Sequence, residues 1–299
     1  MTRIPRSPSL SLRLLLTLAC VCGAASAAIA DPGTSSLANR EGPALWIASG
    51  PEGGTYRSVY ATNLEALMRG NRIFYRETEG SAQNIELMQA GEADIAFVQA
   101  DVFAAAWQAG ETSGVQVIGR ISDECLYIAY RKGGRIQQFE HLKSPPDGEP
   151  ARIAVGPDHS GPAGSWRWFS ERVPELAGNE TSDQVGTLAL NQLALGRYDA
   201  VVWVTDPGNL DHKMLQGTLS NDALGIMPVT DAGLLAPLAD GTVIYRKRKV
   251  TLSGGWKSKK VETICTSALV LMRRDADRQL VDRISDLVSL KRDLIAPHD

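Results

Sequence analysis

The chain has 299 residues, of which 43% are hydrophobic and 22% are charged, and its formal net charge is -3. This composition fits a globular protein with enough apolar surface for one large core or two smaller ones. It excludes a protein built to hold nucleic acid, which needs a clustered basic face, and we interpret the two basic stretches at 246–249 and 257–260 as solvated loops or strand edges.

The first thirty residues differ from the rest of the chain. Arginines precede a short apolar run over 14–27, and small residues in A-x-A spacing end at Ala27 and at Ala30. This order is typical of a secretory signal peptide over 1–30, so we expect a periplasmic mature protein. The run is shorter than the roughly 20 apolar residues of a membrane span. Its two cysteines leave lipidation as an alternative, although the residues before them fit a lipid-attachment site poorly.

Strands and helices are predicted to alternate from residue 44 onward. An apolar strand over 44–50 ends at a glycine-rich turn, and apolar residues at helical spacing follow until Gly70. A strand over 72–79, a helix after the N-cap Ser81, and a strand over 94–99 continue the pattern. Strict alternation of this kind predicts an α/β lobe with a largely parallel sheet.

The middle of the chain first departs from this alternation and then resumes it. An alanine-rich helix to residue 109, which Asp101 could cap, is followed by two strands, a proline-bearing region and a new strand–turn–helix sequence. The predicted ranges are strands 115–121 and 125–131, the proline-bearing region 142–150, a strand 151–156, a turn 157–165, a helix from about Trp166, a helix 187–196 and a strand 199–205. The proline-bearing region indicates a lobe boundary or an exposed connection. The C-terminal segment 266–290 reads as a strand followed by an amphipathic helix.

A short internal repetition favours two similar lobes. "LMQAGEADIAFVQ" and "QLALGRYDAVVWV" both place a helix before a glycine, an aspartate three residues later and then an apolar strand. The glycines are Gly91 and Gly196, and the aspartates are Asp94 and Asp199. Chance remains an alternative explanation, because this order of elements is common.

Three glycine-bearing turns are candidates for binding a small anion. They lie at Gly53–Tyr56, Gly80–Asn84 and Ser160–Ser165, each at the start of a predicted helix, where unpaired backbone N–H groups favour negative charge. Taken singly, each turn is better explained by a tight connection between strand and helix, and only the three together favour a shared cleft. Their spacing matches no nucleotide-binding loop, so we expect no cofactor.

The cysteines and histidines give no metal-binding pattern. Cys125 and Cys265 lie in apolar, strand-like runs without partners at zinc-site spacing. A disulfide and two buried thiols both remain open from these residues alone. His159 next to Ser160 is a poor arrangement for nucleophilic catalysis, since neighbouring side chains point apart.

Four landmarks together resemble the TAXI group of TRAP-transporter solute receptors. They are "EGGTY" at 52–56, "TEGSAQNIELMQAGEADIAFVQAD" at 78–101, "IAVGPDHSG" at 153–161 and "ALNQLALGRYDAVVWV" at 189–204. The resemblance implies an α/β fold of the two-lobed periplasmic binding protein type (type II-like). Each lobe would be a mostly parallel sheet flanked by helices, with a ligand cleft between the lobes.

The resemblance also implies a set of ligand-binding residues. From the first turn, the second turn, a strand end and the opposite lobe, these are Gly54, Thr55, Tyr56, Ser81, Asn84, Gln99, Ser160 and Gly161. The chain departs from the family at Pro162, where a threonine is usual, and at Arg57, where an apolar or aromatic residue is common. Arg57 could pair with a ligand carboxylate or could be a solvated arginine on the first helical turn.

The function implied by the resemblance is capture of a small carboxylate such as glutamate, glutamine, 2-oxoglutarate or a related dicarboxylate. We expect a non-enzymatic monomer that delivers this ligand to TRAP membrane subunits. A periplasmic receptor that signals to a membrane sensor is one alternative, and neighbouring genes would distinguish the two. A hydrolase or lyase on the same fold is another alternative, which turnover of a candidate ester or acid would reveal.

The family topology further implies the lobe boundaries. The first lobe would combine 43–127 with 266–299, and the second would span 128–265. Cys125 and Cys265 would then both lie on the strands that cross between the lobes. We therefore expect them to be close enough to form a disulfide.

Overall fold

A computed structural model describes residues 43–254 and 257–297. The signal peptide predicted over 1–30 lies outside these residues. Within the described part of the chain, no helix is both long enough and apolar enough to cross a membrane.

The first half of the molecule contains a βαβαβ unit, which we call the first unit. It comprises β1 (Ala44–Ala48), η1 (Tyr56–Ala61, a π-helical turn), α1 (Thr62–Leu67), β2 (Arg72–Arg76), α2 (Ser81–Gln89) and β3 (Ile95–Gln99). β1 lies between β2 and β3 and is parallel to both. α3 (Ala100–Gln108) follows directly, so Gln99 occupies its N-cap position and Asp101 lies in its first turn rather than capping it.

A second βαβαβ unit follows and has the same layout. It comprises β5 (Arg152–Ala154), α5 (Gly161–Arg172), the 3₁₀ turn η2 (Pro174–Leu176), β6 (Glu180–Ser182), α6 (Gly186–Ala194) and β7 (Ala200–Thr205). β5 lies between β6 and β7 and is parallel to both. The parallel arrangement predicted for each lobe is therefore present in both units.

The internal repetition of the sequence corresponds to equivalent positions in the two units. Gly91 and Gly196 end α2 and α6 with positive φ angles of 73° and 75°. The carboxylate of Asp94 accepts a hydrogen bond from the Trp46 backbone N–H of β1 at 2.8 Å, and Asp199 accepts one from Arg152 N–H of β5 at 2.9 Å. In each unit the aspartate thus ties the start of the last strand to the central strand.

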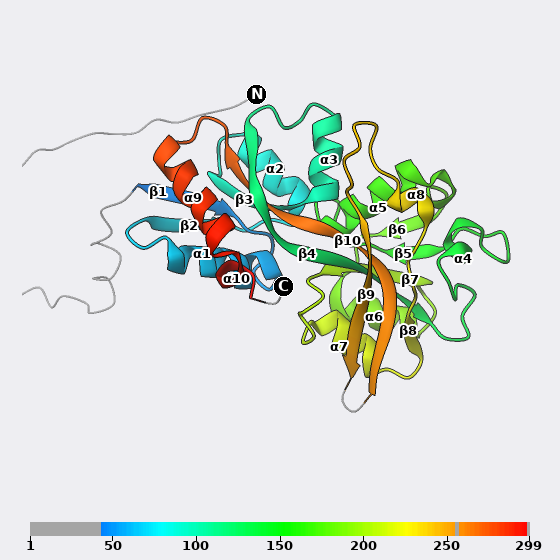
Figure 1. Ribbon diagram of the computed structural model, residues 1–299. Coiled ribbons are helices and arrows are strands. Elements are labelled where there is room, and N and C mark those ends of the chain that lie inside the picture. Colours follow the sequence, from blue (N-terminus) through cyan, green and yellow to red (C-terminus); the bar gives the residue numbers. More distant parts are fainter. Residues whose placement is uncertain (1–42, 255–256, 298–299) are drawn as a thin grey trace, which may run out of the picture. The chain divides into compact units, whose positions relative to one another are not determined.

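Two long antiparallel strands connect the units. They are β4 (Val115–Arg131) and β10 (Lys257–Arg273), which run side by side through the centre of the described structure (Figure 1). The strand order is β2-β1-β3-β10-β4-β7-β5-β6, so each unit pairs with one crossing strand. The remaining elements are α4 (Glu140–Lys143), α7 (Lys213–Leu219), β8 (Leu224–Ile226), α8 (Ala232–Leu235), β9 (Arg246–Gly254), α9 (Arg278–Leu290) and α10 (Arg292–Ile295).

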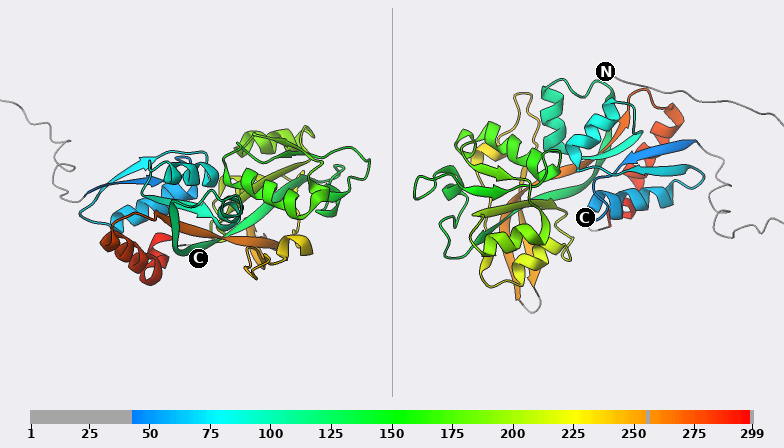
Figure 2. Two further views of the ribbon diagram at one scale, coloured as in Figure 1. Left: turned by 90° about the horizontal axis from the view of Figure 1, so that it is seen from above. Right: turned by 180° about the vertical axis from the view of Figure 1, so that it is seen from behind.

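Separate apolar cores hold the two units. The C-terminal helix α9 returns to the first unit, as both views of Figure 2 show, and buries Ile284, Leu287 and Val288 in one core with Ile47 of β1. A different apolar core lies in the second unit and includes Trp168 of α5. The proposed lobe boundaries at 127/128 and 265/266 fall inside β4 and β10, and they stay a prediction.

The prediction of two strands at 115–121 and 125–131 is wrong, because a single strand, β4, spans both. The three polar residues between the two predicted ranges continue the strand, and each has a partner for its side chain. Ser122 Oγ lies 2.7 Å from the Tyr60 hydroxyl, and Glu124 accepts a hydrogen bond from Tyr56. Asp123 forms ion pairs on the opposite side of the strand.

Two further elements differ from or refine the predictions. α5 begins at Gly161 and not near Trp166, because the Ser160 hydroxyl accepts the Ala163 N–H and Pro162 suits the first turn of a helix. The basic stretches at 246–249 and 257–260 lie on β9 and β10, which pair as an antiparallel hairpin. Of the two interpretations given to them, the strand edge is confirmed.

Candidate functional site

The three glycine-bearing turns line one pocket. The pocket has a volume of about 740 Å³ and lies where the parallel strands of both units end, which is the usual ligand position in open α/β sheets. From the predicted turns it is lined by Gly54, Thr55, Tyr56, Gly80, Ser81, Gln83, Ser160, Gly161 and Pro162. The first residues of η1, α2 and α5 therefore face a common space.

The pocket has two walls of different origin. The N-terminal wall consists of the lining residues between positions 50 and 124, and the C-terminal wall consists of those between 155 and 214. The first contains Glu77, Glu79 and Glu124. The second is largely apolar and contains Val155, Val185, Val201, Val202, Trp203, Val204 and Met214.

The two walls touch at Gly80 and Gly161. Gly80 precedes α2 with a φ of 148°, and a Cβ atom there would lie 2.9 Å from the Gly161 backbone nitrogen. The Ala82 N–H donates to the His159 carbonyl at 3.2 Å, joining the same two turns. Ser81 is the first residue of α2, and its hydroxyl accepts the Gln99 N–H at 3.1 Å instead of capping the helix.

Glu124 is a buried carboxyl group at the pocket surface. It lies on the crossing strand β4, and the Tyr56 hydroxyl donates to its Oε2 at 2.7 Å. Burial is the main cause that raises the pKa of Glu124 to about 8, and the negative charges of Asp101 and Asp206 add to it, while the Tyr56 hydrogen bond opposes it. At neutral pH the carboxyl group therefore keeps its proton in the ligand-free protein.

Three buried polar side chains of the pocket lining lack hydrogen-bond partners among the described residues. They are Gln99, through Nε2, Trp203, through Nε1, and His212, through Nδ1. Burial lowers the pKa of His212, so its ring is neutral at pH 7. Two of the three atoms are donors only, so a ligand with acceptor oxygens would satisfy them.

Most of the residues predicted to bind ligand lie together in this pocket. The structure brings to its lining Gly54, Thr55, Tyr56, Ser81, Gln99, Ser160 and Gly161. Asn84 and Arg57 lie elsewhere. Asn84 is buried behind the second turn, where it donates to the Phe97 carbonyl at 2.8 Å and accepts from Thr78. The guanidinium of Arg57 lies 3.6 Å from the centre of the Tyr75 ring.

Several lining residues were not predicted as ligand-binding. Glu79 belongs to the second landmark at 78–101, and Glu77 directly precedes that landmark. Their position just before Gly80 was the available signal. Glu124 gave no such signal, because it lies in the polar stretch that was read as a break between strands. Trp203, in the strand predicted at 199–205, lines the pocket and also stacks on Tyr127 with ring centres 5.4 Å apart.

The arrangement of His159 and Ser160 does not form a catalytic pair. His159 Nδ1 lies 3.0 Å from Glu86 Oε1, whereas the Ser160 hydroxyl accepts the Ala163 N–H as the cap of α5. Within the described ranges, no group of three or more histidine, cysteine or acidic side chains is placed to hold a metal ion.

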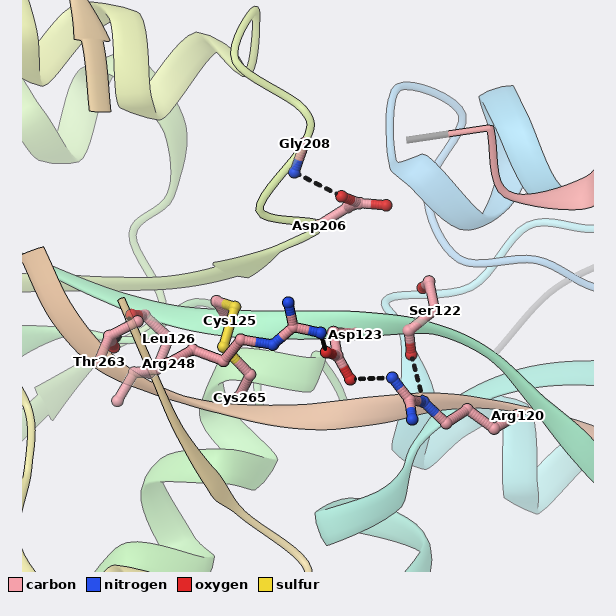
Figure 3. The surroundings of a disulfide bond; sticks show 10 residues. All are labelled: Arg120, Ser122, Asp123, Cys125, Leu126, Asp206, Gly208, Arg248, Thr263 and Cys265. Carbon is pink, nitrogen blue, oxygen red and sulfur yellow. Dashed lines mark hydrogen bonds and ion pairs between the residues drawn. A yellow bond between two sulfur atoms is a disulfide. The ribbon is translucent and has the colours of Figure 1, made fainter. Parts of the chain in front are cut away.

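A disulfide joins the crossing strands beside the pocket. Cys125 of β4 and Cys265 of β10 are direct partners in the antiparallel pairing, with Cα atoms 3.9 Å apart. This is the pair that the family topology indicated. Figure 3 shows Arg120 and Arg248 directed at Asp123, two residues from the disulfide, and both form ion pairs with it.

Two solved structures share this fold. The GluR0 ligand-binding core in complex with L-glutamate is 14% identical, covers 85% of this chain and 96% of its own, and has a TM-score of 0.51. A putative L-cystine ABC transporter from Listeria monocytogenes is 12% identical, covers 83% of this chain and 89% of its own, and has a TM-score of 0.50. The predicted two-lobed binding-protein fold is thus confirmed.

Sequence comparison identifies a family. A search of curated protein sequences gives no match. The model of the NMT1-like family, in contrast, matches residues 47–288, a range that includes the second unit, the first unit from Ile47 onward and every residue of the pocket lining. The chain belongs to the NMT1-like family.

Proposed function

We propose that this protein is a periplasmic solute receptor of the TAXI type, which captures a small carboxylate for a TRAP-type secondary transporter. The observation that carries the proposal is the meeting of three glycine-bearing helix starts, from both units, around one pocket. The pocket volume of about 740 Å³ lies in the range of small-ligand sites. Backbone N–H groups at helix starts are suited to a ligand carboxylate.

The proposed mechanism is closure of two lobes around the ligand. We assign the lobes to 43–127 with 266–299 and to 128–265, so the walls of the pocket belong mainly to different lobes. Only the closed form pairs the donors of both walls with one ligand, and a ligand that prefers this form shifts the population toward it. In this proposal the receptor is a monomer without catalytic activity, and its closed form is recognised by the TRAP membrane subunits.

A thermal-shift screen of the purified exported protein tests the proposal. The panel contains amino acids, 2-oxo acids and dicarboxylates, and a ligand at about one hundred times its Kd should raise the melting temperature by about 5 °C. A panel in which no member changes the melting temperature would contradict the proposal.

A matched pair of glycine variants locates the binding event. The Cβ of Gly161→Ala would lie 2.8 Å from Cδ of the buried Gln99 side chain, so this variant should lose the ligand-induced shift. Gly178→Ala meets no atom within 4 Å and should bind as the wild type does. Equal binding by both variants would place the ligand outside this pocket.

A further inference from the structure

The pocket lining holds acidic side chains and, among its described residues, no cationic side chain to pair with them. Glu77, Glu79 and Glu124 line it, and no lysine or arginine is found among its described lining residues. The nearby Arg57 is held over the Tyr75 ring and outside the lining. A ligand with two carboxylates would therefore bring a second negative charge to a site that offers it no counter-ion.

Two further buried acids lie near Glu124 without lining the pocket. Asp101 and Asp206 are buried and lie near enough to Glu124 to raise its pKa. Asp101 Oδ2 accepts hydrogen bonds from the hydroxyl groups of Ser165 and Tyr245, each at 2.5 Å. Burial raises the pKa of Asp101, whereas these hydrogen bonds favour its ionised form. The acids around Glu124 therefore offer no positive charge to a second ligand carboxylate.

The C-terminal wall favours an apolar group in the part of the ligand that contacts it. It is lined by valines that lie within β7 or follow β5 and β6, together with Met214 and Trp203. An apolar group of the ligand would bury these surfaces, whereas a charged group against them would lose its hydration without compensation.

We propose that the ligand is an apolar amino acid or a close analogue, whose ammonium group pairs with Glu124 and whose apolar side chain packs on the valines of the C-terminal wall. The inference rests on the proposed function, which supplies the carboxylate and its helix-start donors. It replaces the dicarboxylates of the family resemblance with a zwitterion that bears one carboxylate and one amine.

Binding of an ammonium group next to Glu124 should change the protonation of this carboxyl group. Glu124 keeps its proton in the empty pocket. The titratable groups that interact with it are Tyr56, Asp101, Asp206 and Tyr245, and the neutral His212 and the exposed Glu77 and Glu79 share the pocket lining. An ammonium group favours the ionised carboxylate, so binding should release a proton from Glu124 to the solvent. Affinity for the amino acid should then rise between about pH 6.5 and 8.5. A ligand carboxylate that instead accepts a hydrogen bond from protonated Glu124 would bind more weakly as the pH rises.

Matched ligands provide the first test. Isothermal titration calorimetry is carried out with L-leucine, L-phenylalanine, 4-methyl-2-oxopentanoate, L-glutamate and 2-oxoglutarate. L-leucine or L-phenylalanine should bind at least about tenfold more tightly than the 2-oxo acid without the amine, and also more tightly than both dicarboxylates. Tightest binding of a dicarboxylate would overturn this inference and leave the receptor function intact. No binding by any compound of the wider screen would overturn both.

Charge removal at Glu124 provides the second test. Glu124→Gln should weaken binding of the amino acid at least about tenfold, while leaving binding of the 2-oxo acid unchanged or stronger. The exposed Glu175→Gln is the matched control and should bind as the wild type does. If Glu124→Gln fails to fold, the pH dependence of the wild-type affinity decides: affinity that falls with rising pH would overturn the inference.

Discussion

The two βαβαβ units build opposite walls of one pocket from the same layout but with different chemistry. Each unit has a central strand parallel to its two neighbours, a glycine that ends the second helix, and an aspartate that accepts the backbone N–H of the central strand. Yet the first unit and β4 contribute all three lining carboxyl groups, and the second unit contributes the valines. The shared features set the backbone, whereas the lining side chains give the two walls their different chemistry.

The largest expected effect concerns what joins the two units. Replacing Cys125 and Cys265 by serine removes a crosslink across 140 residues of sequence, and the chain-entropy model predicts a loss of about 4–5 kcal/mol in the free energy of unfolding. Urea denaturation of the oxidised wild type, the reduced wild type and the double variant measures it. Equal stability of all three would show that the crossing strands alone hold the units together.

The equivalent aspartates of the two units, Asp94 and Asp199, should contribute differently to the free energy of unfolding. Asp199 is contacted by Arg152 and Arg135 and is largely buried, whereas the ion pair of Asp94 with Arg273 is long, at 3.9 Å. Burial acts to raise the pKa of Asp199, but hydrogen bonds from the two arginines outweigh it, and the pKa is lower than usual. Asp199→Asn should lower the free energy of unfolding by about 2–3 kcal/mol and Asp94→Asn should lower it by about 1 kcal/mol. Thermal unfolding of the two variants measures both changes. A larger loss for Asp94→Asn than for Asp199→Asn would contradict a stabilising role of Arg152 and Arg135.

The contact between the walls depends on glycine. Gly80→Ala forces an alanine into a φ of 148° and places its Cβ 2.9 Å from the Gly161 nitrogen. We therefore expect the free energy of unfolding to fall by about 2 kcal/mol and ligand binding to be lost. Gly110→Ala is the control, since Gly110 has a φ of 80° and its Cβ would meet no atom within 4 Å. Ligand titrations of the two variants separate backbone strain from contact. If Gly80→Ala retained binding, the close approach of the walls would be unnecessary.

The smallest effect concerns the charge of the N-terminal wall. The folded state holds the Glu124 proton up to about pH 8, whereas the unfolded carboxyl loses it near pH 4.5. This contribution to stability is fully present below about pH 4.5 and is lost as the pH rises toward 8. Glu124→Gln should therefore be more stable than the ligand-free wild type at pH 8, by at least about 1 kcal/mol, and lose this advantage at low pH. Melting temperatures between pH 4.5 and 8.5 measure it, and parallel curves would contradict a raised pKa.

Local patterns were sufficient to predict much of the fold. The glycines after α2 and α6 and the apolar runs after them identified both units, because helix ends and buried strands depend on neighbouring residues. The position of the three turns around one pocket followed from the same rule, since parallel strands end at one edge of a sheet.

The features that sequence reasoning missed depend on distant partners. Ser122 and Glu124 looked like a break in β4, and only the hydroxyl groups of Tyr60 and Tyr56, more than 60 residues earlier, allow them to be buried in a strand. Arg57 was considered as a ligand partner, but Tyr75 on a different element holds it. The charge of the pocket could not be inferred for the same reason, because Glu124 joins the site only through the crossing strand.

The crosslink between the crossing strands also protects the pocket against misalignment. Alternate residues of β4 face opposite sides, so Glu124 faces the Tyr56 hydroxyl while Asp123 faces Arg248. If β4 slipped by a single residue against β10, these two acids would exchange sides, and the pocket would receive the shorter aspartate. Oxidation of Cys125 and Cys265 locks their direct opposition, so the correct acid is committed to the binding site before any ligand arrives.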